Sequence, residues 1–229
     1  MVGDVLNEAF DLYKAHWKHL MSVALVFYVI AGTVTLVLTI LLGDWGAFVG
    51  AFILLVGIFW LTGALIEAVA DIRDGRADLT LGETFSRVRP RVLPLLGASI
   101  LAGLGIGLGF VLLIVPGFIL LTWWSLIPAA VVLERRDVFD SFGRSRALVR
   151  GSGWSVFGVL ILTFLLTSVV SGVIRAIFTA LPDYASQYAA NVIGGTIVAP
   201  FSALAITVLY FRLSAATTVR EPVPELEAR

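Results

Sequence analysis

The sequence predicts an all-α, multi-pass membrane protein, a polytopic bundle of six transmembrane helices with three amphipathic helices on its cytoplasmic side. Charged residues make up 14% of the 229 residues and hydrophobic ones 59%, whereas soluble domains carry about 25% charged residues. The mean hydropathy is +0.99. The apolar residues gather into runs long enough to cross a hydrocarbon core of about 30 Å.

A short motif occurs three times and divides the chain into three units. Each copy has an acid, a phenylalanine two residues later and a base four residues after that. The copies are Glu8/Phe10/Lys14, Glu83/Phe85/Arg89 and Asp140/Phe142/Arg146. A long, mostly apolar stretch follows each copy. We therefore expect three parallel repeats, residues 3–70, 79–134 and 137–213, each with one amphipathic helix and two spans. Chance is the alternative, because this spacing is common on helices.

The first unit begins with an amphipathic segment, residues 3–18, whose apolar residues fall on one helical face. Two apolar runs follow it and predict a first span over residues 20–43 and a second over residues 47–70. A Gly-Asp-Trp-Gly sequence, residues 43–46, predicts a tight turn between them.

The second unit opens with Thr80 and Glu83, whose T-x-x-E spacing is a capping box that marks the start of a helix. The apolar run behind it is too long for one span. We expect the break at Pro116, where proline removes an amide donor and the glycine after it permits a turn. This gives spans over residues 93–114 and 118–134.

The third unit starts with a basic amphipathic segment, residues 137–153, and continues with spans over residues 154–181 and 190–213. The six spans form a single membrane domain, residues 1–213. The polar residues 214–229 contain prolines and few apolar side chains, and they predict a disordered cytoplasmic tail.

Basic residues predict how the chain is oriented. All but one of the 16 Lys and Arg residues lie in the N-terminal segment, in the two amphipathic loops, or at the end of the last span and in the tail. The positive-inside rule therefore places both termini and all three amphipathic helices in the cytoplasm, with the spans in the cell membrane. The exception is Arg175, near the outer end of the fifth span.

The amphipathic helices carry the candidate lipid-binding residues. Cations on such helices contact phosphates of anionic phospholipids when the helix lies on a membrane surface. The candidates for the cytoplasmic headgroup surface are Lys14, Arg89, Arg144, Arg146 and Arg150. Membrane lipids are thus the expected partners. The net charge of zero gives no reason to expect a nucleic acid.

Three ionisable residues lie within or close to the spans. Glu67 and Glu134 stand near the inner ends of spans two and four, where they either pair with neighbouring arginines or bind an ion or a headgroup. Arg175 either extends to the outer headgroups or faces a cavity, where it binds an anion or pairs with Asp183. Pro128 and Pro200 lie inside spans four and six, where they kink the helices or are absorbed by their neighbours.

No set of residues suited to catalysis is recognisable. The chain has no cysteine and two histidines, His16 and His19, which are too few for a metal site without further ligands. Nucleotide-binding, serine-hydrolase and zinc-protease motifs are missing. We therefore expect no enzyme activity, no metal and no cofactor. A catalyst would have to be assembled from Glu67, Glu134 and the histidines.

The stretch over residues 112–154 resembles a family of bacterial and archaeal six-span proteins, which are similar to the membrane domain fused to some glycerophosphoryl diester phosphodiesterases. The residues that carry the likeness are Pro116-Gly117, Pro128, Glu134, Arg144-Ser145, Leu148 and Gly151. The opening GDVLNEAFDLYKAHW also looks like that family's N-terminus. The resemblance implies a six-helix fold and a connection with lipids. It implies no hydrolase activity, because the phosphodiesterase catalytic domain is not in this sequence.

These observations favour a membrane protein without catalytic activity that binds lipid or acts as a scaffold or accessory subunit, either as a homo-oligomer or with a partner membrane protein. The alternative is a transporter or channel for small molecules or lipids, with a pathway between the repeats. A water-filled cavity lined by residues such as Asn191 and Thr196 would favour transport, and a dry bundle would count against it.

Overall fold

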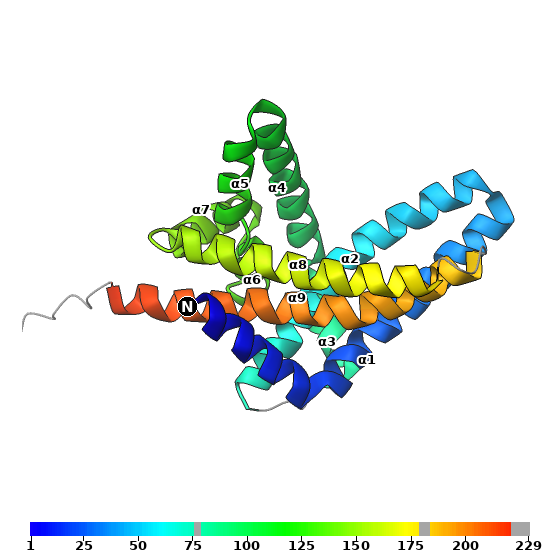
Figure 1. Ribbon diagram of the computed structural model, residues 1–229, viewed down its shortest axis with the longest axis horizontal. Coiled ribbons are helices and arrows are strands. Elements are labelled where there is room, and N and C mark those ends of the chain that lie inside the picture. Colours follow the sequence, from blue (N-terminus) through cyan, green and yellow to red (C-terminus); the bar gives the residue numbers. More distant parts are fainter. Residues whose placement is uncertain (76–78, 179–183, 221–229) are drawn as a thin grey trace, which may run out of the picture.

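The computed structural model describes residues 1–75, 79–178 and 184–220, and all regular secondary structure in these ranges is helical (Figure 1). Six helical stretches there are long and apolar enough to cross a membrane, which confirms the predicted fold class. The elements are α1 (Val2–Leu42), α2 (Asp44–Arg73), α3 (Leu81–Val88), the 3-10 helix η1 (Arg89–Arg91), α4 (Val92–Leu112), α5 (Ile114–Trp123), α6 (Ile127–Leu133), α7 (Val138–Val149), α8 (Gly153–Phe178) and α9 (Tyr184–Arg220).

The first amphipathic segment and the first span are parts of one bent helix, α1. Its backbone leaves helical geometry at His16, where φ is −121° and ψ is 20°. The bend falls within two residues of the boundary expected between the segments. At the far end of the span, Gly43 has φ of 57° and joins α1 to α2, in the turn predicted there. The second amphipathic helix, α3, also starts as predicted: Glu83 N–H donates to Thr80 Oγ1 over 3.3 Å, and Thr80 N–H donates to Glu83 Oε2 over 2.9 Å.

The expected turn at Pro116 is wrong by a few residues. The helix α4 ends at Leu112, and Leu113 alone is extended, with φ of −158° and ψ of 143°. Pro116 instead lies in the first turn of α5, where an amide needs no helical acceptor and the fixed φ of proline suits a helix. The proline therefore follows the turn rather than making it.

Pro128, for which the sequence left open a kink or a continuous helix, stands at the start of a helix. The fourth span is interrupted between α5 and α6, from Trp124 to Leu126, and Pro128 is in the first turn of α6. The helix α9, by contrast, continues through Pro200. It also extends to Arg220, so the first residues of the expected disordered tail are helical. Residues 221–229 lie outside the described residues.

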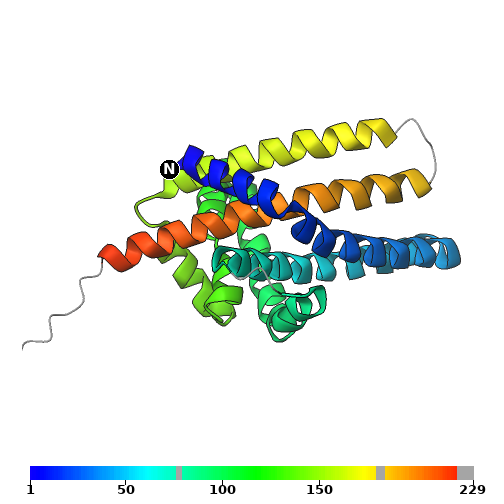
Figure 2. The ribbon, with the colours of Figure 1, turned by 90° about the horizontal axis from the view of Figure 1, so that it is seen from below.

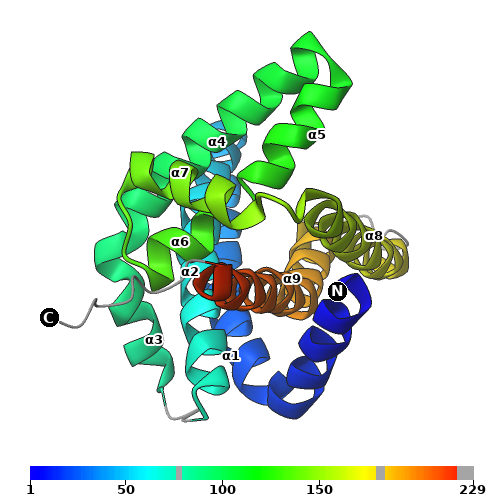
Figure 3. The same cartoon turned by 90° about the vertical axis from the view of Figure 1, so that its left-hand side faces the viewer.

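The six long helices form three hairpins, α1–α2, α4–α5 and α8–α9. In Figure 1, α8, α9 and most of α2 follow the long axis, while the α4–α5 hairpin projects away from it. Figure 2 shows the first part of α1 crossing in front of α8 and α9. Seen along the long axis in Figure 3, α9 is central and α4–α5 stands out to one side.

Each amphipathic helix packs on the last span of another unit, through one pair of aromatic rings. On α3, Phe85 meets Trp60 of α2 with centroids 5.5 Å apart. On α7, Phe142 meets Trp124, in the break between α5 and α6, at 5.0 Å. On α1, Tyr13 meets Phe201 of α9 at 6.2 Å. The second unit thus docks on the first, the third on the second and the first on the third. This closed ring supports the predicted threefold repeat, which itself stays a prediction.

Candidate functional site

The carboxylate of Glu134 is the centre of a charged cluster that joins three helices. Arg144 of α7 donates through Nε to both carboxylate oxygens, over 2.6 and 2.9 Å. Tyr210 of α9 donates its hydroxyl over 2.7 Å, and Arg136 donates through Nε over 3.1 Å. The ion pair expected for Glu134 is therefore present. Tyr210 lies in an apolar span and belongs to no motif, so no sequence pattern pointed to it.

These partners also keep Glu134 ionised. Burial raises the pKa of the Glu134 carboxyl, but the hydrogen bonds from Tyr210, Arg144 and Arg136 outweigh it and hold that pKa below its ordinary value. Its side chain is only 17% exposed. A half-buried carboxylate with three donors is thus held by its protein partners, and it has little capacity left for a ligand.

Next to this cluster, Ser145 closes the break in the fourth span. Its buried hydroxyl donates to the carbonyl oxygen of Trp123 over 2.7 Å and accepts from the amide of Leu126 over 3.2 Å. One side chain thereby partners a carbonyl and an amide on the two sides of the interruption. Ser145 belongs to the family-like motif quoted above, which was the only sequence signal for it.

The other two junctions of the ring carry ion pairs of different strength. Glu67 of α2 and Arg87 of α3 approach to 3.7 Å, and the arginine side chain is 55% exposed. Glu8 of α1 is held more closely, by Arg212 of α9 at 2.6 Å and by Arg73 of α2 at 3.0 Å. At the other two junctions the amphipathic helix supplies the arginine, whereas at this third junction it supplies the acid. Tight ion pairs thus hold the first and third amphipathic helices.

The proposed headgroup cations divide into two groups. Arg144 is engaged by the carboxylate of the charged cluster, so it is not a free surface cation. The exposed cations are Lys14, Arg89, Arg146 and Arg150, of which Lys14 also pairs with Asp11 on the surface at 3.0 Å. Lys14 lies over the ring of Phe10 and Arg146 over the ring of Trp123, at 4.7 and 4.3 Å from the centroids. These contacts hold the two charges at the protein surface.

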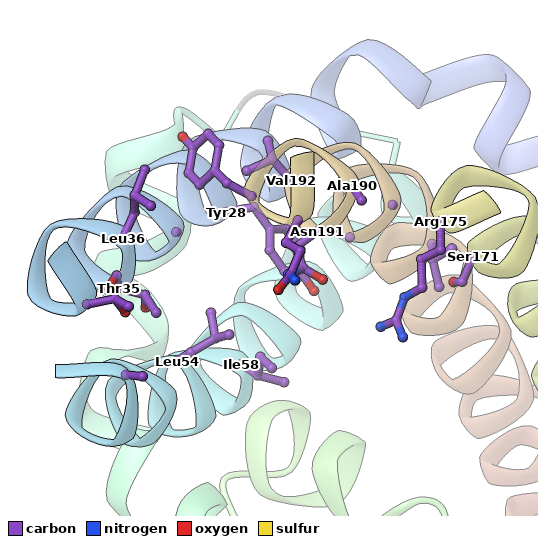
Figure 4. Close-up of a pocket in the computed structure, with 18 residues that line it drawn as sticks. Tyr28, Thr35, Leu36, Leu54, Ile58, Ser171, Arg175, Ala190, Asn191 and Val192 are labelled. Atoms are coloured by element: carbon purple, nitrogen blue, oxygen red, sulfur yellow. Dashed lines mark hydrogen bonds between the residues drawn. The ribbon is translucent and has the colours of Figure 1, made fainter. Parts of the chain in front are cut away.

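A cavity of about 580 Å³ lies between α1, α2, α8 and α9, toward the end of the bundle away from the Glu134 cluster (Figure 4). Apolar side chains such as Leu36, Leu54 and Ile58 form much of its wall. Its polar lining residues include Tyr28, Thr35, Ser171, Arg175, Gln187 and Asn191. Asn191 is thus part of the lining, as the transport alternative requires, whereas the buried Thr196 is not.

Two glycines let α1 and α9 approach closely enough to shape this cavity. A Cβ at Gly195 would overlap the ring of Tyr28, and a Cβ at Gly32 would come within 2.8 Å of the ring of Tyr188. Each helix thus supplies one tyrosine that lies against a glycine of the other. Only glycine leaves room for such contact, which fixes where the Tyr28 ring borders the cavity.

Arg175 faces the cavity, which is one of the two positions that the sequence left open for it. Figure 4 shows its guanidinium extending from α8 toward the space beside Asn191 of α9. Among the described residues, no acidic side chain lines this cavity or forms an ion pair with Arg175. Asp183, the partner suggested by the sequence, lies outside the described residues. Arg175 thus brings a positive charge to a largely apolar site.

Packed apolar residues of α1, α2 and α9 lie between the cavity and the end of the bundle that carries the ion pairs. Leu20 of α1, Leu61 and Leu65 of α2 and Leu204 of α9 belong to one buried cluster. On each helix, the leucine lies between the residues that line the cavity and the charged end of the bundle, where the Glu134 cluster is. Because these side chains are at most 1% exposed, α1, α2 and α9 are tightly packed against one another at this level. Within the described ranges, no three His, Cys, Asp or Glu side chains gather as metal ligands.

Comparison with known proteins places the chain in a family. The family described as "Domain of unknown function (DUF7847)" matches residues 12–218. The chain belongs to this family. A UPF0259 membrane protein of Pectobacterium carotovorum subsp. carotovorum (strain PC1) is 34% identical over 103 residues, which cover 45% of this DUF7847 protein and 41% of the relative. The chain thus spans less than half of the curated relative it matches.

The comparisons also bear on the expected resemblance. Membership of the DUF7847 family and the likeness to a UPF0259 membrane protein confirm an uncharacterised membrane protein family. The finer likeness to the membrane domain of glycerophosphoryl diester phosphodiesterases stays an expectation. No solved structure matches this DUF7847 protein.

Proposed function

We propose that this DUF7847 protein is a membrane protein without catalytic activity that binds a lipid in the cavity between its first and third hairpins. The cavity itself carries the proposal. Its volume of about 580 Å³ falls in the range of about 300–1,000 Å³ typical of small-molecule sites, which combine apolar walls with a few convergent polar groups.

The surroundings of the cavity favour a ligand that comes from the membrane. On the outer surface of the same helices, Phe48 and Phe52 of α2 are 70% and 62% exposed, and Phe164 and Val169 of α8 are both 65% exposed. Such apolar surfaces contact acyl chains when the helices span a bilayer. A molecule dissolved in the bilayer is therefore concentrated beside the cavity.

The basic surface at the charged end supports a second, less specific contact with lipid. Lys14, Arg89, Arg146 and Arg150 are exposed there, and each cation near an anionic leaflet contributes about 1 kcal/mol of attraction. We assign this surface to the cytoplasmic leaflet, with both termini in the cytoplasm, on the charge pattern of the sequence. It orients the protein, whereas the cavity selects a ligand.

Native mass spectrometry of the protein released gently from its own membrane tests the proposal. We expect a retained lipid, and we expect Ser171→Phe to lose it because Ser171 lines the cavity. Gly172→Phe is the matched control, since Gly172 is exposed and no atom lies within 4 Å of its Cβ position. A wild-type protein without lipid, or equal retention by both variants, would refute the proposed site.

Transport is the second candidate, because the cavity lies between two repeats and Asn191 lines it. The packed cluster of Leu20, Leu61, Leu65 and Leu204 argues against an open pathway. Transport would require α1, α2 and α9 to separate at that level. Flux of a co-purified ligand across liposomes, abolished by Ser171→Phe, would favour transport over binding alone.

A further inference from the structure

We infer that the cavity selects a ligand with an anionic phosphate headgroup, which Arg175 binds, and that the ligand enters sideways from the membrane between α2 and α8. This inference rests on the proposed lipid binding and adds the ligand's charge, its anchoring residue and its route. It places the site in the leaflet opposite the charged end.

Among the described residues, the lining of the cavity carries one positive charge and no negative one. Arg175 lines it together with Ser171, one helical turn earlier on α8, and Asn191 on α9, and no described acidic residue shares that lining. Arg175 lies in the last turn of α8, where no described residue supplies a counter-ion, and natural proteins pair arginines of membrane helices. A ligand that supplies the anion pairs with Arg175 and gains charge-assisted hydrogen bonds.

The donor set favours phosphate over a simple halide or a zwitterionic headgroup. A guanidinium presents parallel N–H donors that match two oxygens of one phosphate. The Asn191 amide and the Ser171 hydroxyl lie on the same side of the cavity as Arg175 (Figure 4), and both donate hydrogen bonds to anionic oxygens. A choline group would bring a second positive charge close to Arg175, so phosphatidylcholine binds less well.

The proposed route of ligand entry follows from the helices that line the cavity. α9 contributes Asn191, Gly194 and Gly195 to the lining, while Ile58 of α2 and Ser171 of α8 stand on opposite sides of the space (Figure 4). The buried leucines described above pack α1, α2 and α9 together on the side toward the charged end. Access between α2 and α8 therefore lets a headgroup reach Arg175 while its acyl chains stay in the membrane.

The test is a native mass spectrometry titration of the purified full chain. The probes are phosphatidylglycerol, phosphatidylcholine with the same acyl chains, and inorganic phosphate. We expect at least about tenfold tighter binding of phosphatidylglycerol than of phosphatidylcholine. Arg175→Gln removes this preference, and Arg175→Lys keeps part of it because one donor group remains. Arg87→Gln is the control, since it removes one cation at the charged end.

Other outcomes separate the two proposals. If the wild type binds no lipid, the proposed function fails. If it binds both lipids equally, and Arg175→Gln changes nothing, lipid binding stands and the anionic selection is wrong. Binding of inorganic phosphate but not of phosphatidylglycerol identifies a soluble anion and overturns the lipid source. If Ser171→Phe fills the cavity and the preference persists, Arg175 acts at the bilayer surface and the assigned site is wrong.

Discussion

Replacing Ser145 by alanine tests whether one hydroxyl stabilises the interrupted fourth span. Its Oγ is 2.7 Å from the carbonyl oxygen of Trp123 and 3.2 Å from the amide of Leu126, and Ser145 is fully buried. Alanine leaves both backbone groups without this partner, and a buried polar group that loses its partner costs about 1–3 kcal/mol. We expect Ser145→Ala to lower the free energy of unfolding by about 2–4 kcal/mol.

Thermal unfolding in detergent, followed by circular dichroism, measures this loss. For a chain of this size, about 1 kcal/mol lowers Tm by about 2–4 °C, so we expect a fall of about 5–15 °C. Ser141→Ala is the matched control: Ser141 is equally buried on α7, but its hydroxyl donates only to Val138 within the same helix. That variant should lose less than about 1 kcal/mol. Equal, small losses in both variants would show that Ser145 does not stabilise the break.

Three further predictions concern the charged cluster, the cavity and the orientation. Because the pKa of Glu134 is lowered, its stabilisation is complete above the ordinary carboxyl pKa of about 4.3 and is lost as pH falls through the lower folded value. Glu134→Gln should therefore reduce Tm at pH 7, and its difference from wild type should shrink below about pH 4; a difference that stays constant with pH would contradict this. Gly195→Ala should lower the free energy of unfolding by about 1–3 kcal/mol, because its methyl group meets the Tyr28 ring. Gly103 lies in open space, so Gly103→Ala should raise that free energy by up to about 1 kcal/mol. Thermal unfolding compares the two variants, and equal effects would argue against the close contact. The chain has no cysteine, so a membrane-impermeant maleimide should label Asp44→Cys in intact cells and Arg150→Cys only after permeabilisation; the opposite pattern would reverse the predicted orientation.

The parts of the fold that could be predicted from the sequence depend on short-range patterns. Apolar runs define the long helices, and the capping box at Thr80 marks the start of α3. The structural roles of Pro116 and Pro128 could not be predicted, because a proline both interrupts a helix and suits the first turn of one. Pro116 and Pro128 occupy first turns, and nothing in their neighbouring residues distinguishes the two roles.

The parts that could not be predicted depend on contacts between distant residues. Glu134 was correctly expected to pair with arginine, since basic residues adjoin it in the sequence. Its bond to Tyr210 joins residues 76 apart, and the pair of Glu8 with Arg212 joins residues 204 apart. The cavity likewise arises from four helices, and its boundary depends on a contact between Tyr28 and Gly195. Such contacts leave no periodic signal in a single sequence.

The ring of docked amphipathic helices has a consequence for biosynthesis. Among the described helices, α1 is synthesised before α9, which supplies several of its docking partners. Tyr13 donates to the carbonyl oxygen of Ile197, and Glu8 accepts from Arg212. Until α9 is inserted, Glu8 lacks its Arg212 partner and can pair only with Arg73 of α2. Completion of the last span therefore brings the two ends of the chain together.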